Sequence, residues 1–237
     1  TNVLTNISLN KDISFIVFTG DLTQDHSEQS YQRFVDCVRN CNIKLPIYYL
    51  AGNHDETTLL EKYFSSLPFN ANKTITLGGW QLQLIDSKSD TPAGYVSKAS
   101  LSVLSTAIDP NKYQLVMMHH NPIDVGYFID KHGLKNKQDF WSTINQYSNI
   151  KAIACGHVHR AMELTQPLKF FAKGIEHSAI NPKQQSTCLP VTLYTCPATS
   201  IQFDPDTEGV AALPQGPGYR IFHLFDSGKL TSKVIYP

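Results

Sequence analysis

The chain has 237 residues, of which 41% are hydrophobic and 17% are charged, and its formal net charge is zero. This length and apolar content are sufficient for a folded globular chain with a sizeable core, and they exclude a disordered one. The neutral charge balance gives no support to a nucleic-acid partner or to binding at an anionic membrane, so we expect neither.

Cysteine usage and hydropathy indicate the compartment. The five cysteines form an odd number without a Cys-x-x-Cys pair, which fits a reduced setting better than a disulfide framework. No apolar run approaches the length of a membrane span, and we expect no signal peptide. We therefore expect a cytoplasmic protein.

Strands and helices are predicted to alternate in the first half of the chain. The run at 13–19 is almost entirely β-branched and aromatic, which indicates a buried strand. Residues 27–41 have apolar side chains at helical spacing, with Ser27 in the N-cap position. The other elements predicted here are a strand at 47–51, a helix at 58–64, and a hairpin whose strands at 75–77 and 82–85 flank Gly78-Gly79.

The alternation continues to residue 155 and then changes character. The predicted elements are helices at 97–108 and 140–147, strands at 115–118 and 150–155, and closing strands at 191–196, 219–225 and 230–235. The stretch 166–189 is polar and has no clear periodicity, which predicts an insertion loop. The β-α alternation predicts a layered α/β fold, and we expect residues 1–237 to form one domain.

Four of the predicted strands end in short motifs that contain Asp, Asn or His. The motifs are FTGDLTQD (18–25), AGNHDE (51–56), MMHHNP (117–122) and CGHVHR (155–160). Ligands of open α/β sheets bind at the carboxyl ends of the strands, where these side chains would gather. Carboxylate, amide and imidazole groups suit divalent cations such as manganese, iron, zinc or cobalt. The motifs together predict a site for two metal ions.

The motif Gly156-His157-Val158-His159 sets a geometric condition. Alternate residues of an extended segment point to opposite sides. Either this segment leaves strand geometry, or the two imidazoles surround separate ions. In the motif Asn53-His54, the amide offers a neutral metal ligand and the adjacent imidazole can reach the reacting group.

The order Gly-Asp, Gly-Asn-His-Asp, His and Gly-His-x-His resembles the calcineurin-like metallophosphoesterase superfamily. With the later segment CPATSIQF (196–203), the pattern is similar to the bacterial class III 3′,5′-cyclic-AMP phosphodiesterases. The resemblance covers about residues 15–235. It implies a four-layer α-β-β-α sandwich with phosphodiesterase activity. The implied reaction is the hydrolysis of 3′,5′-cyclic AMP to 5′-AMP, or the hydrolysis of another small phosphodiester. It also implies two divalent ions that activate a bridging hydroxide, iron or manganese first and zinc or cobalt as alternatives.

The resemblance further implies a role for each motif residue. Asp21 would bridge both metal ions, and Asn53, His119 and His157 would complete the shell of the second. His159 would ligate the first. His54 would stabilise the transition state or protonate the leaving oxygen, with Asp55 orienting it.

Two neighbouring positions carry weaker expectations. His120 would have a structural role rather than bind a metal directly. Phosphatase relatives have an Asp three residues after the bridging one, whereas this chain has Gln24 there and Asp25 next. That leaves the support of His54 from this segment open.

One motif that the resemblance leads us to expect is absent from the chain. An Asp-x-His pair on the first strand would supply two ligands to the first metal, and no such pair occurs before Asp21. We expect this strand to lie upstream of Thr1 in a longer protein rather than to have been lost. Without it, the first metal would keep only Asp21 and His159, so we expect a metal-poor and weakly active chain.

Two alternatives to the cyclic-AMP hypothesis remain open at this level. The same metal centre could serve a nucleotidase, a glycerophosphodiesterase or a general phosphatase. Alternatively, the fold could be a catalytically inactive scaffold, since the first motif is missing. The sequence predicts neither the oligomeric state nor the role of the insertion, which could cap the site, mediate self-association or be a variable surface loop.

Overall fold

A computed structural model describes residues 2–166 and 191–237. Its largest element is a six-stranded sheet with the order β4-β5-β6-β7-β9-β8. The central strands β5, β6, β7 and β9 are parallel, and the two edge strands β4 and β8 are antiparallel to their neighbours. The strands are β4 (Thr74–Leu77), β5 (Trp80–Leu84), β6 (Tyr113–Met118), β7 (Ile150–Cys155), β8 (Met162–Gln166) and β9 (Val191–Thr195).

A second strand layer lies against this sheet and consists of two separate pieces. One is a parallel three-stranded sheet, β1-β2-β3, and the other is an antiparallel pair, β10-β11. Their strands are β1 (Ile16–Phe18), β2 (Ile47–Tyr49), β3 (Phe69–Asn70), β10 (Tyr219–Leu224) and β11 (Leu230–Ile235).

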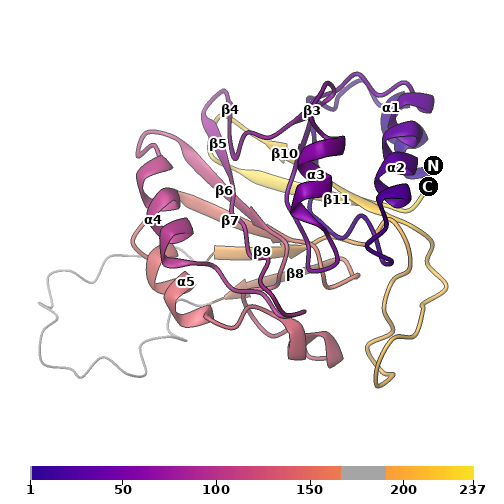
Figure 1. The fold of residues 1–237 in the computed structure, drawn as a ribbon. Helices are drawn as coiled ribbons and strands as arrows, with labels where there is room; N and C mark the ends of the chain where they lie inside the picture. Colours follow the sequence, from indigo (N-terminus) through magenta and orange to yellow (C-terminus); the bar gives the residue numbers. More distant parts are fainter. Residues whose placement is uncertain (1, 167–190) are drawn as a thin grey trace, which may run out of the picture.

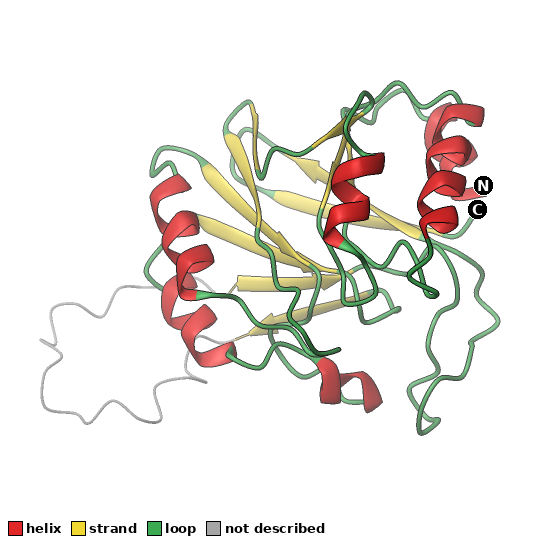
Figure 2. Cartoon of the chain, in the orientation of Figure 1, coloured by secondary structure: helices red, strands yellow, loops and turns green. Residues whose placement is uncertain are grey.

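Helices cover the outer faces of both strand layers (Figure 1). Those on the six-stranded sheet are α4 (Lys98–Ala107) and α5 (Lys137–Ile144), and those on the smaller sheets are α1 (Asn2–Leu9), α2 (Glu28–Asn40) and α3 (Thr57–Tyr63). A short 3-10 helix, η1 (Phe128–His132), follows β6. Figure 2 shows the resulting order of helix, strand, strand and helix layers. None of the helices in residues 2–166 and 191–237 is long and apolar enough to cross a membrane.

Three apolar cores separate the four layers. In β6, Val116 and Met118 pack toward α4 and α5, whereas Leu115 and Met117 pack into the core between the strand layers. This alternation follows from the two-residue period of a strand, and it explains why β6 is apolar almost throughout. A third core joins α1, α2 and α3 to β2. The predicted four-layer fold is thus confirmed.

A cavity of about 1290 Å³ runs between β1 and β10. Successive residues of both strands line it, 15–19 on one side and 219–225 on the other. A cavity at the face of a strand would meet only alternate side chains, so this one lies along the strand edges. The second strand layer is therefore split into two separate sheets at this cavity.

Most of the predicted elements are confirmed. Ser27 and Ser97 cap α2 and α4 by accepting hydrogen bonds from the backbone N–H of Ser30 and Ser100. The predicted hairpin at Gly78-Gly79 forms between β4 and β5. The predicted insertion at 166–189 falls almost wholly outside the described residues.

Some boundaries were wrong. The helix predicted at 140–147 spans Lys137–Ile144, because Asn136 stands before its first turn and the polar residues 137–139 belong to it. The short elements β3, β8 and η1 were not predicted. In β8 only Met162 and Leu164 pack against a core, and a strand paired on one side carries too few apolar residues to be recognised.

Candidate metal centre

The four motifs meet where β1, β2, β6 and β7 end, so they draw residues from both strand layers. Two glycines allow this close approach. A Cβ on Gly20 would lie 2.4 Å from the backbone nitrogen of Gly52, and one on Gly52 would lie 2.1 Å from Oδ1 of Asp21. Gly20 also has a φ of +101°, which side chains disfavour. Both glycines are therefore required for the loops to touch.

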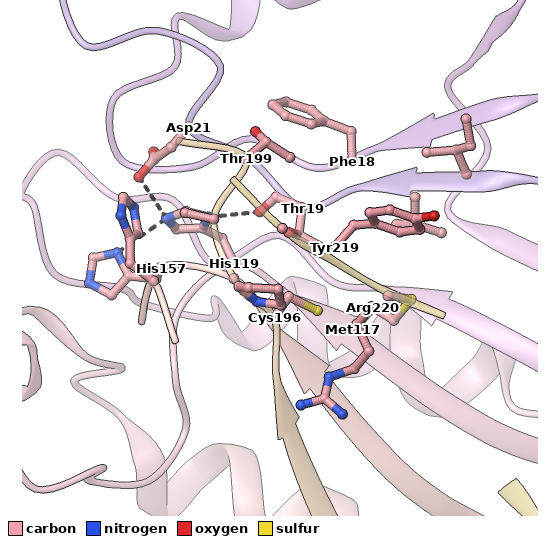
Figure 3. A pocket seen from close by; sticks show the side chains of 18 of the residues that line it. Phe18, Thr19, Asp21, Met117, His119, His157, Cys196, Thr199, Tyr219 and Arg220 are labelled. Atoms are coloured by element: carbon pink, nitrogen blue, oxygen red, sulfur yellow. Dashed lines mark hydrogen bonds and ion pairs between the residues drawn. The ribbon is translucent and has the colours of Figure 1, made fainter. Parts of the chain in front are cut away.

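Four potential ligand atoms converge at the imidazole of His119. Its Nε2 lies 3.2 Å from Oδ2 of Asp21, 3.2 Å from Oδ1 of Asn53 and 3.2 Å from Nδ1 of His157. The opposite nitrogen, Nδ1, donates a hydrogen bond to the carbonyl of Thr19 at 2.7 Å. Figure 3 shows the Asp21 carboxylate directed at the His119 ring. We call these four side chains, Asp21, Asn53, His119 and His157, the cage.

The cage fits a divalent cation. Because Nδ1 of His119 carries the hydrogen given to Thr19, Nε2 of the neutral ring has only a lone pair to direct at the other three ligand atoms. Such an arrangement requires a positive charge at its centre. Nitrogen and oxygen ligands bind zinc-like cations at about 2.0–2.2 Å, which places neighbouring ligands about 3–3.5 Å apart. The observed separations of 3.2 Å lie in that range.

The ionisation of the cage agrees with this interpretation. Burial alone would raise the pKa of Asp21, but His119 and the N–H of His54 lower it below 3.8. Burial alone would lower the pKa of His119, but the Asp21 carboxylate raises it overall. Burial and the adjacent imidazoles hold the pKa of His157 well below 6.5. The carboxylate thus favours a positive charge beside it, which a cation bound in the cage would supply.

His159 lies near the cage, close enough to Asp21, His119 and His54 for their charges to affect its pKa. Its Nδ1 donates to the carbonyl of Ile201 at 3.0 Å, which leaves Nε2 free as a ligand atom. The ring of Phe203 stacks on the imidazole with centroids 4.0 Å apart. His157 and His159 have φ values of 59° and 52°, so the segment leaves strand geometry, the first of the two possibilities set by its sequence.

His54 lies beside the cage without belonging to it. Its backbone N–H donates to Oδ1 of Asp21 at 2.9 Å. Its Nδ1 lies 3.5 Å from Nε2 of Gln24, so the glutamine stands where the phosphatase pattern has an Asp. The support of His54 that the sequence left open therefore comes from this amide.

The expectation that Asp55 orients His54 is wrong. The buried Asp55 carboxylate instead accepts hydrogen bonds from the backbone N–H groups of Gly52, Asp21 and Leu22 at 2.7–3.0 Å and from the hydroxyl of Tyr31. It thus joins the loops after β1 and β2. The physical reason is that those loops bury several backbone donors, and a carboxylate offers four acceptor positions.

His120 has the structural role that we expected. Its Nδ1 contacts the hydroxyl of Ser87 at 2.9 Å, and its Nε2 donates to the carbonyl of Pro92 at 3.2 Å. Burial, followed by the charge of His119, lowers its pKa to about 3. The candidate ligand atoms of His119, His120 and His157 all lie within 4.8 Å of one another. Both of its nitrogens already have partners, so the cage is better completed by Asp21 and Asn53.

Sequence reasoning missed three supports of the centre. Lys88 donates to the backbone carbonyl of Asn53 at 3.3 Å, and Ile201 and Phe203 hold His159. Only the segment CPATSIQF was singled out from the sequence, and nothing in it indicated contact with His159. Lys88 lies in the loop after β5, and this loop contains no recognisable motif.

The fold and the cage together define a hydrolytic metallophosphoesterase. A family model described as calcineurin-like phosphoesterase matches residues 1–161. The chain belongs to this calcineurin-like phosphoesterase family, as the resemblance implied, and it is a hydrolase.

Relatives and a solved structure agree with this placement. A "probable cyclic nucleotide phosphodiesterase" of Colwellia psychrerythraea is 61% identical over 98% of this chain and 83% of its own length. The "3′,5′-cyclic adenosine monophosphate phosphodiesterase CpdA" of Vibrio vulnificus is 31% identical over 94% of this chain and 74% of its own length. A dimetal phosphatase from Danio rerio has a similar fold, with a TM-score of 0.59 at 12% identity, over 93% of this chain and 84% of its own.

Proposed function

We propose that this chain is a metal-dependent phosphodiesterase that hydrolyses 3′,5′-cyclic AMP to 5′-AMP. The observation that carries the proposal is the cage, in which ligand atoms of Asp21, Asn53 and His157 each lie 3.2 Å from Nε2 of His119. The names of the relatives from Colwellia and Vibrio support a cyclic nucleotide as the substrate.

The cage and His159 would hold two divalent ions, iron or manganese first, with zinc or cobalt as alternatives. When bound, such ions supply a nucleophile at neutral pH and offset the charge of the phosphoryl oxygens. Asp21, whose Oδ2 faces His119, would bridge both positions. We further propose that the cage position binds its ion more tightly, because three other side chains share it with Asp21.

We assign proton transfer to His54. Opening the cyclic phosphate to 5′-AMP adds the elements of water, breaks the bond between phosphorus and O3′, and requires a proton on O3′. The His54 imidazole lies at the edge of the cage and is free of the metal-facing contacts that occupy His119 and His157. A general acid in this place contributes about 10²–10⁴-fold to the rate.

The test is a comparison of substrates on the manganese-loaded protein. We expect release of 5′-AMP from cyclic AMP with a higher kcat/KM than hydrolysis of bis-p-nitrophenyl phosphate or p-nitrophenyl phosphate. The Asp21→Asn variant, prepared and loaded in parallel, is the control for contaminating activity. A preference for the phosphomonoester would favour a phosphatase, and absence of turnover with every substrate would favour a scaffold.

A further inference from the structure

We propose that Phe128 is the stacking platform for the base of a purine nucleotide bound at the metal centre. This inference rests on the proposed function and names the part of the site that recognises the base. It starts from the aromatic residues that line the cavity beside the cage.

Most of these aromatic residues are accounted for by the folding cores. Phe15 and Phe222 pack in the core between the strand layers, and Phe18 and Tyr219 pack in the core under α1 to α3. Phe128 and Phe203 line the same cavity but belong to none of the three cores. Their position is therefore not explained by the packing of the layers.

The two rings form a row with His159, which we propose as a metal ligand. Phe203 stacks on His159 at 4.0 Å with an interplanar angle of 9°, and Phe128 follows at 5.2 Å from Phe203. Phe203 is only 8% exposed, because these two neighbours cover it. Both rings line the cavity, and the half-buried Phe128 is the more exposed of the two. If the phosphate of a nucleotide lies at the cage, the Phe128 ring is available to its base on the side of His159.

The wall that carries this row is held in place by hydrogen bonds. The buried Gln202 bonds to the backbone of Ala198 and Gly216 at 2.8–3.1 Å, which closes the loop between β9 and β10. The Asp130 carboxylate accepts from the N–H groups of Val125 and Gly126 at 2.8 Å and fixes η1. An ordered platform reduces the conformational entropy that binding would otherwise cost.

The chemistry of the wall fits a neutral base. Ile201 and Val210, which line the same cavity, are 41% and 69% exposed, so apolar surface is available beside Phe128. Thr199 also lines the cavity, and its hydroxyl has no hydrogen-bond partner among the described residues (Figure 3). Base–aromatic stacking is favourable for any base and provides roughly a 5- to 150-fold gain in affinity.

The test compares ligands with and without a base on the manganese-loaded protein. Calorimetry would measure the binding of 5′-AMP and of ribose 5-phosphate to the wild type, Phe128→Ala, Phe128→Tyr and Phe225→Ala. Phe225 is the matched control, because it is a 47% exposed aromatic residue of the same cavity at the β10-β11 turn. We expect Phe128→Ala to weaken 5′-AMP roughly 5- to 150-fold and leave ribose 5-phosphate unchanged. Phe128→Tyr should restore affinity, and Phe225→Ala should have no effect.

Kinetics give a second readout. With cyclic AMP, Phe128→Ala should raise KM with little change in kcat, whereas with methyl p-nitrophenyl phosphate both constants should stay the same. Equal losses for both ligands, or none for 5′-AMP, would overturn the role of Phe128 and leave the proposed function intact. If the wild type neither bound 5′-AMP nor hydrolysed cyclic AMP, the proposed function itself would fail, and this inference with it.

Discussion

The two sides of the Asp21 carboxylate are built very differently. Toward β6 and β7, Asn53, His119 and His157 surround it with ligand atoms at 3.2 Å from Nε2 of His119. The other predicted position has only His159 besides Asp21 among the predicted ligands, and His159 lines the cavity between β1 and β10. The difference indicates that a predicted metal position has more candidate ligands where more strands end beside it.

The largest effect is expected from Asp21→Asn, which alters both sides at once. The substitution removes the one negative charge shared by the two positions, so metal binding and hydrolysis should both fall. We expect a loss of activity beyond the roughly 10²–10⁴-fold attributed to a general acid. Metal content by mass spectrometry and turnover of cyclic AMP measure the two losses. A variant that retained its full metal content would contradict the shared role.

A pair of substitutions separates the two sides. His119→Gln removes the central ligand of the cage, and its tightly bound ion should be lost, with affinity lowered by more than about 100-fold. His159→Gln should leave that ion in place and abolish only the weaker one. Titration with Mn²⁺ followed by calorimetry distinguishes two classes of site. Equal losses in the two variants would mean that the sides do not differ.

His54 provides a smaller effect that leaves both metal positions intact. His54→Ala removes the proposed proton donor while the backbone N–H to Asp21 remains, so metal stoichiometry should not change. The kcat for cyclic AMP should fall by about 10²–10⁴-fold. Unchanged hydrolysis would exclude His54 from proton transfer. Gln24→Ala serves as a comparison, because it removes only the amide beside the ring.

The support of the cage can be probed through stability. The hydroxyl of the buried Tyr31 donates to Asp55 at 3.3 Å and accepts from the N–H of Glu56 at 2.7 Å. Tyr31→Phe should lower the free energy of unfolding by about 1–2 kcal/mol. Tyr63→Phe, whose hydroxyl contacts the exposed Glu28, should change it by less than about 0.5 kcal/mol. Urea denaturation measures both, and equal effects would contradict a special role for the buried hydroxyl.

The smallest effect concerns pH. Asp25 accepts hydrogen bonds from Thr23, Ser27 and Ser30 at 2.7–3.0 Å, and these lower its pKa below the ordinary value of 3.8. A lowered pKa stabilises the fold above 3.8, and this stability is lost as the pH falls through the folded-state value. Asp25→Asn should therefore lower Tm slightly at pH 7, as measured by thermal unfolding followed by circular dichroism. The difference should shrink on acidification below 3.8, and a constant difference would exclude the carboxylate as its source.

Sequence reasoning predicted the gathering of the motif residues better than their supports. Asp21, Asn53, His119 and His157 meet because each follows the end of a strand, and their roles as ligands stay predictions. Asp55 was assigned to the wrong partner. Its sequence position next to His54 suggested contact, whereas the buried N–H groups of the loop after β1 attracted its carboxylate. Such long-range hydrogen bonds leave no pattern in the sequence.

The sequence by itself determined a layered α/β fold, the strand-end motifs and their class of chemistry, and the resemblance added the four-layer order. Apolar periodicity and ligand type are local properties, and they survive in any arrangement that buries the same faces. Only the tertiary structure decided which candidate ligand atoms lie together, which way the His119 imidazole presents its lone pair, and that Phe203 and Phe128 continue the row from His159. Those features depend on contacts between segments far apart in the chain, and their geometry follows from how the layers pack.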